Sequence, residues 1–149
     1  MGLGLFAIAK ISKGEVIIDY SNAPGKFLTT KEADALFEKG NDYMMQIDED
    51  SFFVATNREE LESSDFINHS CNPNCGIKNK FKIIAMRDID KKEEITIDYA
   101  MCESSEYEMP CQCKNKNCRK VITGNDWKIK SLQEKYNGFF SDYLQRLIF

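Results

Sequence analysis

The stretch of sequence that decides the fold is Asp65-Phe66-Ile67-Asn68-His69-Ser70-Cys71-Asn72-Pro73-Asn74-Cys75. It holds the protein's single histidine, flanked by amide and thiol side chains. A lone histidine is more often structural than catalytic, and a Cys–His nucleophile pair is the other interpretation. His69 and Cys71 share one face of an extended segment, but no third orienting group is near them, and sequence-adjacent Cys and His rarely form a dyad. The stretch therefore disfavours a hydrolase.

Length and composition indicate a single globular domain. The chain has 149 residues, of which 42% are hydrophobic and 30% are charged, so its composition is not that of a disordered protein. The net charge of −4 argues against generic binding to nucleic acid or anionic membrane and suits a basic partner. No apolar run approaches the roughly 20 residues of a membrane span, and residues 1–10 lack the features of a signal peptide. We expect an intracellular protein, with cytoplasm and nucleus not distinguished.

The cysteine pattern favours a metal site. Three of the six cysteines lie within eight residues, as Cys111-Gln112-Cys113 followed by Cys118. The even number would also allow three disulfides, but nothing in the sequence implies an oxidising compartment. Thiolates crowded this closely in a reducing cell more often bind zinc than each other.

Periodicity and turn residues predict a β-rich α+β domain with a small metal-bound lobe and a helical tail. The expected elements are strands at 3–8, 15–20, 43–47, 52–55, 81–86 and 94–99, a helix at 30–40, and further helix beyond Trp127. Apolar residues of the tail recur at spacings of three and four: Leu132, Tyr136, Phe139, Phe140, Tyr143, Leu144 and Leu147. We interpret this stripe as a packing face, with a partner-binding helix as the alternative.

Four further motifs accompany the opening stretch, and their order along the chain is informative. They are Gly2-Leu3-Gly4, Tyr43-Met44-Met45-Gln46-Ile47-Asp48, Glu93-Glu94-Ile95-Thr96-Ile97-Asp98-Tyr99, and Cys111-Gln112-Cys113 continuing to Cys118-Arg119. Taken together with Phe66 to Asn74, they resemble the SET domain of protein-lysine methyltransferases with its post-SET cysteine motif. The resemblance covers residues 2 to about 124, and the Asn-His-Ser-Cys-Asn-Pro-Asn segment is its most specific part.

The resemblance implies a SET-domain fold of several short-stranded sheets, with a SET domain at 1–101, a post-SET zinc segment at 102–124 and a helical tail at 125–149. It also implies transfer of methyl groups from S-adenosylmethionine to the side-chain amine of lysine. The expected substrate is a basic, lysine-containing protein or peptide, and a histone-like protein is one candidate. A monomer is expected, with no membrane partner and nucleic acid contacted only indirectly, if at all.

The resemblance also assigns roles to individual residues. Tyr99 matches the catalytic tyrosine, Tyr43 lines the lysine channel, and Ile97 occupies the position that controls methyl number, where isoleucine favours di- or trimethylation. The cofactor-binding residues would be Gly2, Leu3, Gly4, Phe66, Asn68 and His69, with His69 acting mainly through its main chain. One structural zinc ion would be held by Cys71, Cys111, Cys113 and Cys118. Cys75 and Cys102 are left over and are expected to be free or buried.

Two charged runs leave alternatives open. The acidic run before the opening stretch could attract a basic substrate or form a solvated loop: Asp48, Glu49, Asp50, Glu59, Glu60, Glu62 and Asp65. The basic run could touch nucleic acid or simply be solvated: Lys114, Lys116, Arg119, Lys120, Lys128 and Lys130. The rival to an enzyme is a non-catalytic, zinc-stabilised SET module that binds peptides or chromatin.

Overall fold

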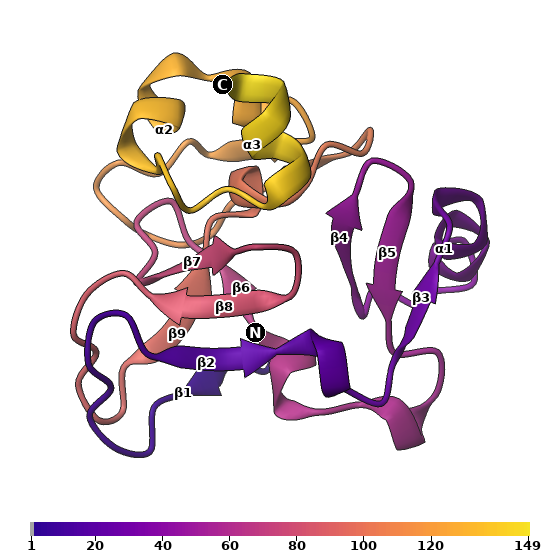
Figure 1. The fold of residues 1–149 in the computed structure, drawn as a ribbon, viewed down its shortest axis with the longest axis horizontal. Helices are drawn as coiled ribbons and strands as arrows, with labels where there is room; N and C mark the ends of the chain where they lie inside the picture. The colour runs from indigo at the N-terminus through magenta and orange to yellow at the C-terminus, as the bar shows by residue number, and fades with distance from the viewer. Residues whose placement is uncertain (1) are drawn as a thin grey trace.

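Short strands dominate the computed structural model, which describes residues 2–149 (Figure 1). The strands are β1 (Leu5–Phe6), β2 (Val16–Asp19), β3 (Lys26–Leu28), β4 (Met44–Asp48), β5 (Ser51–Val54), β6 (Asn68–His69), β7 (Cys75–Lys78), β8 (Lys82–Ala85), β9 (Glu94–Ile97), β10 (Glu108–Pro110) and β11 (Val121–Thr123). The α-helices are α1 (Thr30–Phe37), α2 (Lys130–Lys135) and α3 (Asp142–Ile148). Single turns of 3-10 helix include η3 (Ser63–Phe66) and η4 (Tyr99–Met101). No helix within residues 2–149 is long and apolar enough to cross a bilayer.

The strands form separate small sheets rather than one continuous layer. Their orders are β2-β8-β7, β1-β9-β6, β3-β5-β4 and β10-β11. Figure 1 shows the β3-β5-β4 sheet and helix α1 together at one side of the molecule, and helices α2 and α3 together beyond β7. This arrangement confirms the predicted β-rich α+β class with several short sheets and few helices.

The opening stretch of the sequence lies beside the Glu93–Tyr99 motif. Strand β6 pairs in parallel with β9, with Asn68 opposite Thr96 and His69 opposite Ile97. The side chain of Asn74 reinforces the pairing, because its Nδ2 donates to the carbonyl of Glu94 (2.8 Å) and its Oδ1 accepts from the N–H of Thr96 (3.0 Å). Two motifs more than twenty residues apart are thereby held side by side.

The predicted strand at 94–99 ends two residues early. Strand β9 stops at Ile97, and Tyr99 opens the turn η4 instead of ending the strand. The cause is Asp98, whose carboxylate accepts a hydrogen bond from the N–H of Ala100 (3.0 Å) and so caps the turn. Side-chain capping of this kind competes with continued sheet pairing. The prediction that Tyr99 ends a strand was therefore wrong, because Tyr99 has the backbone conformation of a 3-10 turn.

Other boundaries also differ from those predicted. The strand predicted at 3–8 contains only β1, and the helix predicted at 30–40 is α-helical only to Phe37, with Gly40 at a positive φ of 90° ending the turns that follow. Strands β3, β6, β7, β10 and β11 were not predicted. Their two to four residues each are too few to show a period of two.

The tail is helical, but it is broken in two. Gly138, at a φ of +87°, lies between α2 and α3, and an L-residue seldom adopts that backbone conformation. Most of the predicted apolar stripe is nevertheless in the hydrophobic core: Leu132, Tyr136, Phe140, Tyr143 and Leu144. Leu147 is the exception, because half of its surface remains exposed (51%). The interpretation of the stripe as a packing face is confirmed for its buried members.

Replacing Gly76 with alanine should loosen the contact between the tail and β7. The N–H of Ile77 donates to the carbonyl of Phe139 (2.9 Å), and a Cβ on Gly76 would lie 2.7 Å from the Cβ of Phe139. Overpacking of this kind costs about 1–3 kcal/mol, so the urea midpoint of Gly76→Ala should fall. Lys78→Ala, at the exposed end of the same strand, is the control. Equal midpoints for the two variants would contradict the packing described here.

Candidate active site and metal centre

A cavity of about 240 Å³ gathers most of the residues predicted for cofactor and substrate. The predicted residues that line it are Gly2, Leu3, Tyr43, Phe66, Asn68 and Tyr99. They come from the amino-terminal segment, the residue just before β4, the turn η3, strand β6 and the turn η4. These segments are far apart in the sequence. Asp42, Asp65 and Ile67 complete the lining and were not predicted as site residues.

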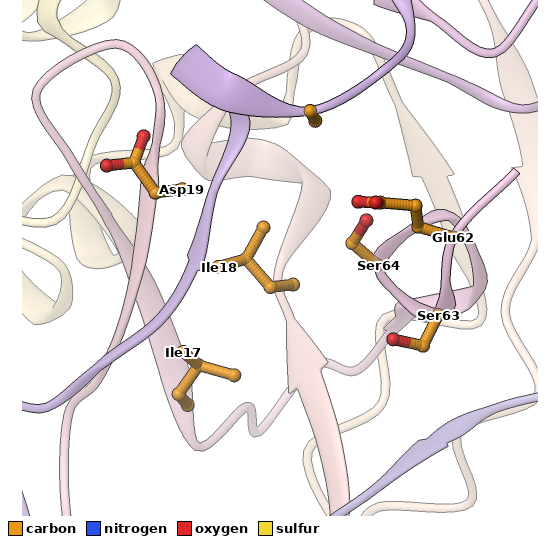
Figure 2. A pocket seen from close by; sticks show the side chains of 7 residues that line it. Ile17, Ile18, Asp19, Glu62, Ser63 and Ser64 are labelled. Atoms are coloured by element: carbon orange, nitrogen blue, oxygen red, sulfur yellow. The ribbon is translucent and has the colours of Figure 1, made fainter. Parts of the chain in front are cut away.

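A second, larger hollow of about 470 Å³ has a different character. Figure 2 shows Ile17 and Ile18 of β2 on one side and Glu62, Ser63 and Ser64 on the other. None of the residues predicted to bind cofactor, lysine or metal lines this hollow. The smaller cavity is therefore the candidate active site.

Tyr99 is held at three points in the candidate site. Its hydroxyl donates to the carbonyl of Ile67 (3.2 Å), its N–H donates to Nδ1 of His69 (3.2 Å), and its ring packs against the His69 ring at a centroid distance of 5.2 Å. Burial raises the pKa of Tyr99 well above its usual value. The hydroxyl therefore stays protonated at neutral pH, so it can donate one hydrogen bond and accept others but cannot act as a base.

The side chain of His69 links Tyr99 to a cysteine. Because Nδ1 accepts from the N–H of Tyr99, the ring proton belongs on Nε2, which lies 3.3 Å from Sγ of Cys71. Burial is the largest cause that lowers the pKa of His69 to about 4, so the ring is neutral at neutral pH. Nδ1 of His69 lies 3.6 Å from Oδ1 of Asp98, but the neutral ring forms no ion pair with this carboxylate. The sequence had suggested a main-chain role, and the structure adds this side-chain bridge.

Tyr43 and Phe66 form an aromatic wall of the cavity. Their rings meet edge to face, with centroids 5.6 Å apart and planes at 71°. Ile97 does not line the cavity; it is buried in the core, with 1% of its surface exposed. Its influence on methyl number stays a prediction.

Asn68 is oriented by a carboxylate that the sequence reasoning missed. Its Nδ2 donates to the carbonyl of Leu3 (2.9 Å) and to Oε1 of Glu94 (2.8 Å). Gly4 makes room for this pair, because a Cβ there would lie 2.6 Å from Oε1 of Glu94 and 3.3 Å from Nδ2 of Asn68. Gly4 therefore acts behind the cavity wall, whereas Gly2 lines the cavity itself.

If Asn68 binds the cofactor, as the family resemblance implies, Gly4→Ala should weaken that binding by displacing Glu94 from Asn68. Losing a hydrogen bond to a charged group costs about 1.5–3 kcal/mol, which corresponds to roughly a tenfold or greater rise in Kd. Titration calorimetry with S-adenosylmethionine measures it. Glu93→Gln is the matched control, since the neighbouring Glu93 pairs with Arg87 (2.9 Å) and not with Asn68. An unchanged affinity of Gly4→Ala for S-adenosylmethionine would show that Glu94 has no role in cofactor binding.

The charge of the cavity favours a cationic ligand. Asp42 and Asp65 line it, and no lysine or arginine is among its lining residues in the described part of the chain. Burial raises the pKa of Asp65, because it disfavours the charged form of the carboxyl group. A positively charged sulfonium would be attracted by the half-buried carboxylate of Asp65 and by the exposed carboxylate of Asp42.

Much of the acidic run singled out in the sequence is used for local structure. Asp48 pairs with Lys80 (2.6 Å), Asp50 accepts from the N–H of Thr30 (3.0 Å), and Glu60 pairs with Lys26. These contacts give three of the seven acidic residues a role in local structure, and Glu60 among them is buried rather than solvated. Glu62 and Asp65 differ, because each faces one of the two hollows.

Four cysteines from two distant segments meet in one cluster. The sulfur atoms of Cys71, Cys111, Cys113 and Cys118 all lie within 4.8 Å of one another, and those of Cys71 and Cys111 are 3.8 Å apart. A zinc–sulfur distance of about 2.3 Å in a tetrahedron places the sulfurs about 3.8 Å apart. The cluster therefore has the size and donor set to hold a metal ion.

Main-chain hydrogen bonds support the cluster. The N–H groups of Arg119 and Lys120 lie 3.4 Å from the sulfurs of Cys71 and Cys118, respectively. Such donors stabilise thiolates. Cys75 and Cys102 are outside the cluster and buried in the core, as predicted for the two cysteines left over.

Comparison with known proteins places the chain in a family. The SET domain matches residues 2–100. The chain belongs to the SET domain family. It is 35% identical over 132 residues to "Histone-lysine N-methyltransferase set1" of Dictyostelium discoideum, covering 80% of this chain and 8% of that protein. It is 36% identical over 130 residues to "Histone-lysine N-methyltransferase, H3 lysine-4 specific" of Schizosaccharomyces pombe, covering 78% of this chain and 14% of that protein.

A human relative gives the same picture. The chain is 33% identical over 129 residues to "Histone-lysine N-methyltransferase SETD1B" of Homo sapiens, covering 80% of this chain and 6% of the relative. This SET chain therefore spans only a small part, 6% to 14%, of these three relatives.

Proposed function

We propose that the chain is a methyltransferase that moves methyl groups from S-adenosylmethionine to the side-chain amine of lysine in a protein. The observation that supports this most is the meeting of Tyr43, Asn68 and Tyr99 in one cavity of a SET domain. The related proteins are named as histone-lysine N-methyltransferases, which supports a histone or another basic protein as substrate.

The reaction first requires a neutral lysine amine. Free lysine titrates near 10.4, so deprotonation at pH 7 costs roughly 4–5 kcal/mol. The aromatic wall of Tyr43 and Phe66 lowers this cost, because a water-poor aromatic surround disfavours the ammonium form. Tyr99 is not the base in this scheme, since its hydroxyl stays protonated; the proton leaves to solvent.

Tyr99 then orients the reacting groups. The chemistry that S-adenosylmethionine supplies when bound is an electrophilic methyl group on a positively charged sulfur. The hydroxyl oxygen of Tyr99 offers lone pairs toward positive charge in the cavity and fixes the direction from which the amine approaches. The bond from this hydroxyl to Ile67 restricts its rotation.

The cofactor-binding roles follow the same scheme. We assign cofactor binding to Gly2, Leu3, Gly4, Phe66, Asn68 and His69, with Gly4 acting through Glu94 and Asn68. We assign one structural zinc ion to Cys71, Cys111, Cys113 and Cys118, whose closed thiolate tetrahedron would leave no position for a substrate. Tyr43 belongs to the lysine channel in this proposal. Ile97 was assigned to the channel with it, but it is buried outside the cavity lining, so its proposed preference for di- or trimethylation would act only through the residues packed around it.

The organisation of the chain is also proposed here. The three segments are the SET domain at 1–101, the post-SET segment at 102–124 and the tail at 125–149. We further propose a monomer inside the cell, in cytoplasm or nucleus, that meets nucleic acid only through its substrate.

Intact-mass spectrometry of basic proteins after incubation with the chain and S-adenosylmethionine tests the function. The expected result is a mass increase by whole methyl groups on at least one histone or histone-like protein, which also reports how many methyl groups are added. No transfer to any protein tested, together with no cofactor binding by calorimetry, would overturn the proposal and leave a non-catalytic SET module that binds peptides or chromatin.

A further inference from the structure

A fully buried carboxylate lies directly before Tyr99. Asp98 has no exposed surface, and its Oδ1 accepts from the N–H of Ala100 (3.0 Å) at the start of turn η4. Its Oδ2 accepts from the hydroxyl of Tyr136 in the tail (3.0 Å). A buried charge of this kind persists only when it is paired and hydrogen-bonded.

The partner of Asp98 is an arginine of the cysteine lobe. The two terminal nitrogens of Arg119 donate to the two carboxylate oxygens of Asp98 at 2.7 and 2.8 Å, and its Nε donates to Asp126 (2.9 Å). The guanidinium is mostly buried, with 17% of the side chain exposed. This two-pronged geometry fixes the plane of the carboxylate, which a single hydrogen bond would leave free to rotate.

Arg119 is also attached to the metal cluster. It directly follows Cys118, and its main-chain N–H lies 3.4 Å from Sγ of Cys71. One residue therefore contacts a proposed metal ligand through its backbone and the carboxylate that caps the turn of Tyr99 through its side chain.

We propose that Arg119 is a positioning residue for methyl transfer, which transmits the order of the four-cysteine lobe to Tyr99 through Asp98. The inference rests on the function proposed above for Tyr99. If the fork opens, only the hydroxyl of Tyr136 and the N–H of Ala100 hold the Asp98 carboxylate, and its plane is less restricted. The hydrogen bond to Ala100 then weakens, and the turn that begins with Tyr99 relaxes. The hydroxyl is at the far end of the ring, so a small rotation of the turn displaces it most.

Arg119→Lys is the first test, because lysine keeps the positive charge but cannot form the planar fork. We expect kcat to fall about tenfold or more, since misplacement of a reacting group by about 1 Å costs up to a hundredfold. The Kd for S-adenosylmethionine should stay within about twofold and the metal content should stay at one ion per chain, because neither the cofactor cavity nor the cysteines are altered. Arg146→Lys is the matched control, and its kcat should not change. Arg146 is exposed, and its Nη2 lies 3.6 Å from Oδ1 of Asp48.

A second variant covers the case in which Arg119→Lys does not fold. Arg119→Met combined with Asp98→Asn removes the fork and the charge of Asp98 together, while Asp126 keeps its hydrogen bond from the hydroxyl of Thr123 (2.9 Å). Without the fork, the asparagine side chain is free to rotate away from the N–H of Ala100. The same loss of kcat is expected. An unchanged kcat in the folded double variant, or in Arg119→Lys, would overturn the proposal.

Hydrogen exchange supplies a readout that does not depend on activity. Removing the metal from the wild-type chain with a chelator should speed amide exchange at Ala100, Met101 and Cys102 by about tenfold or more, because the turn loses its external support. In the double variant these amides should exchange fast before chelation, with little further change. If these three amides stay protected in the wild type after chelation, the proposed coupling of the four-cysteine lobe to Tyr99 is wrong. A wild-type chain that transfers no methyl group would still give this exchange result, so the two proposals fail separately.

Discussion

Tyr99→Phe should lower the rate of methyl transfer by about a hundredfold or more, as expected when a preorganised polar group is removed from a reacting centre. The change deletes one oxygen atom and leaves the ring packed against His69, so the shape of the cavity is preserved. Cofactor affinity should stay unchanged, because the deleted hydroxyl bonds to the Ile67 carbonyl and is proposed to act on the reacting groups. Single-turnover rates together with calorimetry separate the two quantities.

Tyr143→Phe is the matched control for this loss. Tyr143 is buried on α3, and its hydroxyl donates to the carbonyl of Cys102, outside the cavity. Its removal should lower stability by about 1 kcal/mol while the transfer rate per folded molecule stays the same. A Tyr99→Phe chain that transfers methyl groups at the wild-type rate would show that the hydroxyl is not the orienting group.

The sequence predicts the residues of this site better than it predicts their backbone. The motifs containing Tyr43, Asn68 and Tyr99 were located by resemblance, and these residues line one cavity. Nothing in local periodicity indicates that β6 and β9 pair in parallel, because β6 has only two residues. The turn at Tyr99 was missed for a related reason: the capping oxygen of Asp98 outweighs the strand preference of the residues before it.

The four-cysteine cluster was also predictable only in part from local sequence spacing. The spacing of Cys111, Cys113 and Cys118 alone indicates a shared ligand site, whereas Cys71, forty residues earlier than Cys111, was added only by resemblance. Glu94 had no predicted role, and Arg119 was predicted only as part of a basic run that is solvated or touches nucleic acid. Its side chain is instead mostly buried against Asp98. Their partners, Asn68 and Asp98, lie far from them in sequence, so no pattern of spacing could have paired them.

If the four cysteines hold the proposed zinc ion, removing that ion with a chelator should abolish methyl transfer while leaving most of the fold intact. The four sulfurs bring residues 111–118 against Cys71, and a structural zinc site contributes its binding free energy to folding. Without the metal, the lobe loses its support against the turn η4, whereas the β2-β8-β7 sheet has its own hydrogen bonds and core contacts. We expect a loss of about a hundredfold or more in transfer rate, as for a misplaced catalytic group.

Cys113→Ser tests this expectation genetically, with Cys75→Ala as the control. Serine at 113 removes one of four thiolates, so the metal content of the purified chain should fall well below one ion. Cys75 is buried in the core and outside the cluster, so its replacement should leave metal content and transfer rate per folded molecule unchanged. Cysteine thiols must lose their protons to bind a metal ion. As pH falls, the wild-type chain should therefore release its ion and lose activity. Full metal content in Cys113→Ser, or full activity after chelation, would mean that the four cysteines do not form the structural zinc site.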